Sequence, residues 1–155
     1  MLCKKLLKSL TAGALVVGLG VTLAYAAADD QIKARQAEMK GNGKAMGALA
    51  AIMKGEAPYD AAVVKASLDA MAAGDAAADE AKAWDASSME GATIETWAKP
   101  EIWAEGSDVG AKYQAWADAR AALAATTDEA GFKAAFPALG AACGGCHEKF
   151  RRPKG

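Results

Sequence analysis

The stretch Cys143-Gly144-Gly145-Cys146-His147 lies near the end of the chain and decides how its fold is interpreted. Two cysteines separated by two residues, with a histidine directly after the second, form the attachment pattern of a c-type haem. Each thiol can form a thioether with one haem vinyl group, and the following histidine can bind the iron as its proximal ligand. The motif therefore predicts one covalently bound haem c, joined through Cys143 and Cys146, with His147 on its iron.

Two close cysteines also occur in thioredoxin-like redox pairs, in zinc sites and in structural disulfides. A redox pair does not require the following histidine, and it is expected in strand-rich surroundings. A structural zinc site needs four ligands. The chain has one histidine and three cysteines, and Cys3 falls in a leader that is expected to be removed. The remaining side chains are too few for a zinc site of this kind, so haem attachment is favoured.

The first 26 residues have the features of a secretory signal peptide. Three lysines among the first eight residues precede an uncharged, apolar run over 10–23, and Ala24-Tyr25-Ala26 follows as a small-x-small cleavage sequence. The run is short for a membrane span, so a retained anchor is the weaker alternative. We predict cleavage near Ala26, a domain over 27–155, and export to the periplasm. Export agrees with haem attachment, since haem is joined to c-type cytochromes after translocation.

Charge and length limit the partners and the domain count. Removing Lys4, Lys5 and Lys8 with the leader leaves 15 basic and 19 acidic residues, a net charge of −4. A mildly acidic protein gives no reason to expect nucleic acid or an anionic membrane as a partner. The 129 residues after the leader suit a single domain.

The sequence after the leader predicts an all-α fold. Alanine is abundant, β-branched residues are few, and no alternating strand pattern is present, which together favour helix. Ile32, Met39, Met46 and Met53 recur every seven residues, as on a helix that faces a bundle. The expected helices run from Asp30 to Lys54, from about Tyr59 to a point before Trp84, from Ser107 to Ala125, and from a capping box at Thr126-x-x-Glu129 through the cysteine motif.

Two segments are harder to place. Residues 86–106 are predicted to be a long connection with a short turn at Pro100–Trp103, and Trp97 and Trp103 are expected to pack this connection against the helices. Pro137 lies inside the last helical pattern, where proline either kinks a helix or marks its start.

Four short pieces of the sequence carry a resemblance to a known family. They are Arg35-Gln36-x-x-Met39, Lys54-Gly55-Glu56-Ala57-Pro58-Tyr59-Asp60, Pro100-Glu101-Ile102-Trp103, and the cysteine motif followed by Phe150-Arg151. With these pieces the chain resembles the class II cytochromes c, which comprise the cytochromes c prime and their low-spin, methionine-ligated relatives. The resemblance implies an antiparallel, up-down-up-down four-helix bundle with the haem attached to the C-terminal helix.

The sixth iron ligand is the main open question. His147 is the only histidine, so a second histidine ligand from the same chain is excluded, and methionine is the natural candidate. In low-spin members of the family, the methionine three residues after the glutamine of the first helix binds the iron; in cytochromes c prime that position only covers the distal face. The resemblance thus implies Met39 as the ligand. It also places Arg35 and Gln36 at the haem edge, where an arginine suits the haem carboxylates.

Two functions follow from the coordination number. A six-coordinate iron held by His147 and Met39 suits a periplasmic electron carrier that exchanges electrons with soluble or membrane-bound redox partners. A five-coordinate iron suits a cytochrome c prime that binds nitric oxide or carbon monoxide. Peroxidase chemistry is disfavoured because no distal histidine exists to move protons, so an enzyme is not expected. Many members of the family form homodimers, so the resemblance allows a homodimer, but the sequence does not determine the oligomeric state.

Overall fold

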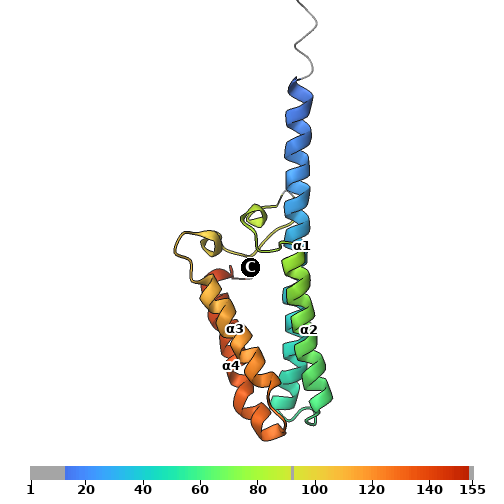
Figure 1. Cartoon of the computed structure of the whole chain (residues 1–155), viewed down its shortest axis with the longest axis vertical. Helices are drawn as coiled ribbons and strands as arrows, with labels where there is room; N and C mark the ends of the chain where they lie inside the picture. Colours follow the sequence, from blue (N-terminus) through green and yellow to red (C-terminus); the bar gives the residue numbers. More distant parts are fainter. Residues whose placement is uncertain (1–12, 92, 154–155) are drawn as a thin grey trace, which may run out of the picture.

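The computed structural model describes residues 13–91 and 93–153, with side chains from Ala26 onward. Four helices form the described part of the chain, which confirms the all-α prediction, and consecutive helices run in opposite directions (Figure 1). Among the residues described, no helix has the length and apolarity required to cross a membrane. The elements are α1 (Gly13–Met53), α2 (Ala61–Glu80), η1 (Ala86–Ser88), η2 (Pro100–Trp103), α3 (Val109–Ala124) and α4 (Glu129–Phe150).

The expected helix bounds agree with the structure except at the start of α1. This helix ends at Met53, one residue before the predicted Lys54, but it begins at Gly13 rather than at Asp30. The alanine-rich residues before Asp30 are good helix formers, so nothing in the local sequence interrupts the helix there. The helix crosses the predicted cleavage point near Ala26, and residues 1–12 of the predicted leader lie outside the described residues.

The start of α4 corrects two expectations. The predicted capping box at Thr126 and Glu129 is wrong, because Asp128 is the N-cap and its side chain accepts a hydrogen bond from the Gly131 N–H at 2.7 Å. Thr126 instead donates its hydroxyl to the Leu123 carbonyl at the end of α3. Pro137 lies inside α4, so it does not mark the helix start. Asp and Thr are both good N-cap residues, and three of them, Thr126, Thr127 and Asp128, stand in succession here.

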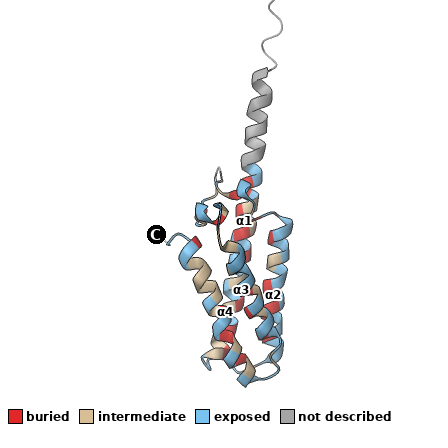
Figure 2. Ribbon diagram, turned by 60° about the vertical axis from the view of Figure 1, so that its left-hand side comes forward, coloured by how far each residue is buried: buried red, intermediate tan, exposed pale blue. Residues whose placement is uncertain are grey.

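The helices pack as two antiparallel pairs that share a core at one end. Helix α1 lies along α2 and α3 along α4, with fewer contacts between the pairs (Figure 1). Buried residues occur toward the α1–α2 and α3–α4 turns and also where the α2–α3 connection crosses α1 (Figure 2). The core cluster comprises Ala45, Leu49, Ile52, Val64, Leu68, Met71, Trp116, Ala119, Leu123, Phe132, Phe136 and Leu139. Cys143 packs against the edge of this core, whereas Cys146 and His147 continue α4 beyond it, and Met39 precedes the core residues of α1.

The connection between α2 and α3 is fastened to α1 by buried polar contacts. The Arg35 guanidinium is 4 % exposed and donates to the Ala83 carbonyl at 2.7 Å, to the Ser88 hydroxyl at 2.8 Å and to the Thr96 hydroxyl at 2.8 Å. The Asp29 carboxylate accepts from the Thr93 N–H and hydroxyl. Trp103 packs in this connection as expected, whereas Trp97 is 40 % exposed. These contacts therefore hold the connection against α1, at the end of the bundle away from the core cluster.

Arg35→Leu should lower the free energy of unfolding of the haem-loaded protein by about 3–5 kcal/mol, because it leaves several buried acceptors without a donor. Urea unfolding followed by far-ultraviolet circular dichroism measures the change. Lys33→Leu is the matched control, since Lys33 is exposed and its ion pair with Asp30 is also exposed, and it should cost less than about 1 kcal/mol. Equal losses in the two variants would show that the Arg35 contacts do not hold the fold.

Candidate functional site

The cysteine motif occupies the last two turns of α4. Cys143, Cys146 and His147 stand at helical spacings of three and four residues, so they share one face of α4. All three are half-buried, and both cysteines are free thiols. Burial raises the pKa of both thiols. The structure therefore brings together the three residues that the motif predicted, with two reduced sulfur atoms on the same side of the helix as the imidazole.

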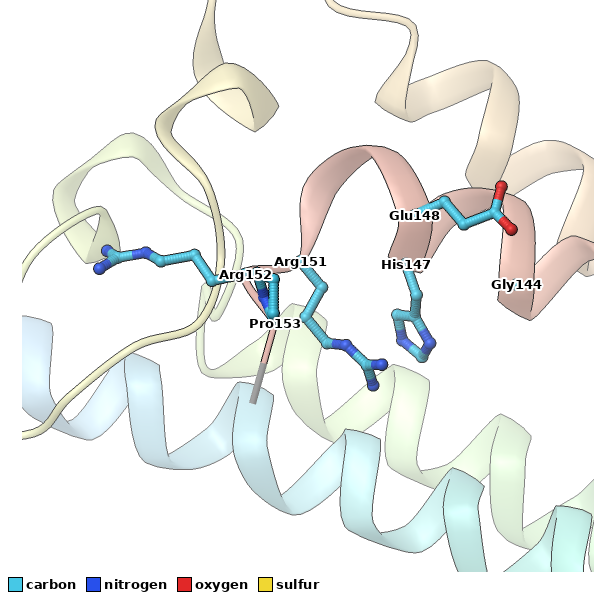
Figure 3. Close-up of a pocket in the computed structure, with 6 residues that line it drawn as sticks. All are labelled: Gly144, His147, Glu148, Arg151, Arg152 and Pro153. Atoms are coloured by element: carbon cyan, nitrogen blue, oxygen red, sulfur yellow. The ribbon is translucent and has the colours of Figure 1, made fainter. Parts of the chain in front are cut away.

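A cavity of about 350 Å³ lies against this end of α4, lined by Gly144, His147, Glu148, Arg151, Arg152 and Pro153. The His147 and Arg151 side chains point from α4 toward α1 and α2 (Figure 3). Burial, with a smaller effect of the Arg151 charge, lowers the pKa of His147. A neutral imidazole offers a nitrogen lone pair to a metal, so the surroundings of His147 favour the form that ligates iron.

Met39 lies on α1 in the half of the bundle that the core leaves open. Ile32 is fully buried and Met46 packs on the core, but Met39 between them is 36 % exposed. These residues share the seven-residue repeat of α1, so Met39 lies on the same face as its covered neighbours. An apolar side chain left uncovered between covered ones is the arrangement expected where a further apolar group packs. The residues present thus fit a haem between α4 and α1.

Arg35 and Gln36 lie where the α2–α3 connection crosses α1, and their hydrogen bonds run to that connection. Arg35 also stacks on Trp84 and Trp103, with its guanidinium carbon 5.1 Å and 5.5 Å from the ring centres. Gln36 is exposed and donates its side-chain N–H to the Glu95 carbonyl at 2.8 Å. Their predicted role at the haem carboxylates stays a prediction.

Glu38 and Trp84 form a polar contact near the site that sequence reasoning missed. The Glu38 carboxylate is 6 % exposed and accepts from the Trp84 indole N–H at 3.0 Å. Burial raises the pKa of Glu38 to about 7, and the charges of Asp75 and Asp79 act in the same direction. The sequence offers one indication that Glu38 lies near the site. Glu38 follows Arg35 by three residues on the same helix and directly precedes Met39.

Glu38→Gln should flatten the dependence of stability on pH. The folded protein holds the Glu38 proton more tightly than the unfolded chain, whose pKa lies near 4.5. This contribution to stability is full below pH 4.5 and is lost as the pH rises through about 7. Between pH 5 and pH 8 the wild type should lose on the order of 2 kcal/mol more than the variant, which keeps an oxygen for Trp84. Urea unfolding at both pH values measures this, and parallel losses would contradict the assignment.

The zinc alternative gains no support from the geometry. Within residues 13–91 and 93–153, no three histidine, cysteine, aspartate or glutamate side chains gather as a metal ion would require. The cysteine motif supplies two thiols and one imidazole on a single helix face, which matches the donor set of haem attachment.

Comparisons with known proteins agree on one family. The family model described as Cytochrome C' matches residues 30–151. A protein named cytochrome c-556 from Agrobacterium fabrum is 40 % identical over 99 % of this chain and 100 % of its own length. These matches extend over the four helices and the motif together.

Solved structures give the same result for the fold. The cytochrome c' of Rubrivivax gelatinosus superposes with a TM-score of 0.71 at 30 % identity, over 81 % of this chain and 97 % of the other. The cytochrome c prime of Alcaligenes xylosoxidans, in a ferrous variant with bound NO, gives a TM-score of 0.67 at 30 % identity, over 82 % and 97 %. A further cytochrome c', described by its ligand-controlled dimer dissociation, gives 0.70 at 32 % identity, over 81 % and 97 %.

Proposed function

The chain belongs to the cytochrome c' family, and on that premise we propose that it is a periplasmic electron carrier whose haem iron is held by His147 and Met39. Haem c with its iron is the cofactor of the family, and Cys143 and Cys146 fit the attachment motif. The observation that carries the proposal is the part-exposed Met39 on the seven-residue repeat of α1, taken with His147, whose side chain points from α4 toward α1 and α2 (Figure 3).

Each residue has a defined task in this proposal. Cys143 and Cys146 would hold the cofactor through two thioethers, and the His147 imidazole and the Met39 thioether would bind its iron. Arg35 and Gln36 would lie at the haem edge, where a guanidinium suits the haem carboxylates. Both terminal nitrogens of Arg35 already donate to the α2–α3 connection, so binding a carboxylate would require Arg35 to exchange some of these contacts. The bound haem supplies a one-electron couple. With the iron held by two protein ligands, a change of oxidation state would need little rearrangement, which suits a carrier.

Gas binding at a five-coordinate iron is the second candidate function. It is favoured by the solved relative from Alcaligenes xylosoxidans, a structurally similar cytochrome c prime whose ferrous form carries bound NO. In this candidate Met39 only covers the distal side of the haem. The two candidates differ in one bond, that between the Met39 sulfur and the iron, and so they predict different responses to carbon monoxide.

The proposal includes export and partners. The family match begins at residue 30, and the solved relatives match about four fifths of this chain with nearly all of their own length. Both observations support removal of a leader that ends near Ala26. The expected partners are periplasmic or membrane-bound redox proteins. A homodimer is also expected, in keeping with the dimer dissociation described for one solved relative.

A spectroelectrochemical titration of the haem-loaded protein tests the proposed function. We expect a single reversible one-electron step whose midpoint potential stays unchanged when the titration is repeated under carbon monoxide. A site closed by Met39 leaves no position for that gas, which binds only ferrous iron and would otherwise stabilise it. A large upward displacement of the midpoint potential under carbon monoxide would favour gas binding instead.

A further inference from the structure

Charge is strongly segregated along this chain. Residues 69–95, which run from α2 into the connection, contain seven acidic side chains and one basic side chain. The end of the bundle that carries the cysteine motif is different. There five cations accompany four acidic side chains, Glu101, Glu105, Asp108 and Glu148, which gives a local charge of +1, although the chain after its leader has a net charge of −4. We call the five cations the basic collar: Lys99, Lys112, Lys149, Arg151 and Arg152.

The contacts of the collar place it around the attachment motif. Arg151 and Arg152 line the same cavity as His147. The Lys112 ammonium lies 3.6 Å from the position that a Cβ on Gly145 would occupy, which is between the two cysteines. On the same end of α4, Lys149 binds Asp108 at 2.7 Å, and Lys99 donates to the Lys149 carbonyl at 3.0 Å. The collar therefore adjoins the part of the molecule where the haem is attached.

An aromatic side chain accompanies the collar at the surface. Trp97 is 40 % exposed, and its carbonyl accepts the Arg152 backbone N–H at 2.7 Å, so the two residues are adjacent. Protein interfaces are enriched in tryptophan and arginine, which supply contact area and directed hydrogen bonds. Cations around an exposed tryptophan are thus suited to bind a protein surface of opposite charge.

We propose that the basic collar and Trp97 form the docking surface for an acidic face of a redox partner protein. The proposal rests on electron carriage as the function, and it assigns the partner's chemistry and the end of the bundle at which electrons pass. Opposite charge would steer a partner toward the motif and away from the acidic side of α2. A protein face is favoured over an anionic bilayer, because membrane-binding basic segments carry clusters of four to eight cations without acidic residues among them.

Two small redox probes of opposite charge test the local charge without knowledge of the partner. The ferrous, haem-loaded protein is mixed in a stopped-flow instrument with hexacyanoferrate(III) or with tris(phenanthroline)cobalt(III), while the ionic strength is raised from about 10 to 200 mM. We expect added salt to slow the reaction with the anionic probe and to speed that with the cationic probe. The net charge of −4 predicts the opposite sign for both probes.

A pair of variants locates the effect. Arg152→Glu should slow the reaction with hexacyanoferrate(III) about three- to ten-fold at low ionic strength. The Arg152 side chain is exposed, and the hydrogen bond from the Arg152 backbone N–H to the Trp97 carbonyl does not depend on that side chain. Lys54→Glu changes the net charge equally at the α1–α2 turn, the far end of the bundle, and should change the rate less than about two-fold (Figure 1).

The remaining outcomes separate this proposal from the proposed function. A protein that exchanges electrons with neither probe would overturn electron carriage and the docking surface together. Electron exchange with reversed salt effects, or with equal effects of the two variants, would overturn the docking surface alone. Sedimentation of the protein with phosphatidylglycerol vesicles at physiological salt would also overturn it, in favour of a membrane surface.

Discussion

Replacing Cys143 and Cys146 together by serine should give a protein from which acidified acetone removes all of the haem. In the wild type two thioethers hold the cofactor, and they survive this treatment. Mass spectrometry of the secreted wild type should show the chain from about Ala27 plus one haem. The single variant Cys143→Ser should keep one thioether at most. The double variant should also be less helical, because without the cofactor nothing fills the bundle beyond the core that ends near Ala45 and Leu139.

Cys3→Ser is the control for the cysteine experiment. Cys3 lies in the predicted leader, so its replacement should leave both the mass of the secreted protein and its haem unchanged. Haem that is extracted from the wild type would contradict covalent attachment. Secreted protein that retains Met1 would contradict the leader without affecting the attachment.

Met39→Ala should open the distal side of the site and convert the iron to a high-spin form. If the thioether occupies the iron for about 99 % of the time, its removal should raise the apparent affinity for carbon monoxide about a hundred-fold. The midpoint potential should fall, since a thioether ligand raises the potential of a c-type iron. Gas titration and spectroelectrochemistry measure the two effects.

Met46→Ala is the matched control, because Met46 lies on the same repeat of α1 but packs on the core. Its replacement should cost about 2 kcal/mol or more of stability while the spin state and the affinity for carbon monoxide stay unchanged. If Met39→Ala behaves in the same way as Met46→Ala, Met39 is a packing residue and not a ligand.

The fold and the attachment face could be predicted because they depend on local spacing. Helical periodicity places Cys143, Cys146 and His147 on one face, and alanine-rich segments between turn residues fix the helix ends to within a few positions, except at the start of α1. The sequence rules for helix ends gave the wrong residue where two residues were almost equally suitable as the N-cap. At the start of α4, Asp128 and Thr126 are both good caps, and only the course of the chain decides between them.

The contacts of the site residues could not be predicted from spacing, since they join distant parts of the chain. Arg35 binds groups 48 to 61 residues further on, in a connection without regular periodicity. The burial of Glu38 depends on Trp84 from the same connection. The family resemblance placed Arg35 near the haem edge, but only the folded connection reveals that the guanidinium also fastens this connection to α1.

The absorption spectrum of the ferrous wild type, recorded before and after addition of carbon monoxide, tests the central claim most directly. Ligation by His147 and Met39 predicts the sharp, split visible bands of a low-spin haem, with little or slow change when the gas is added. A broad high-spin spectrum that changes at once under carbon monoxide would contradict Met39 ligation, and it would make the protein a five-coordinate, gas-binding member of its family.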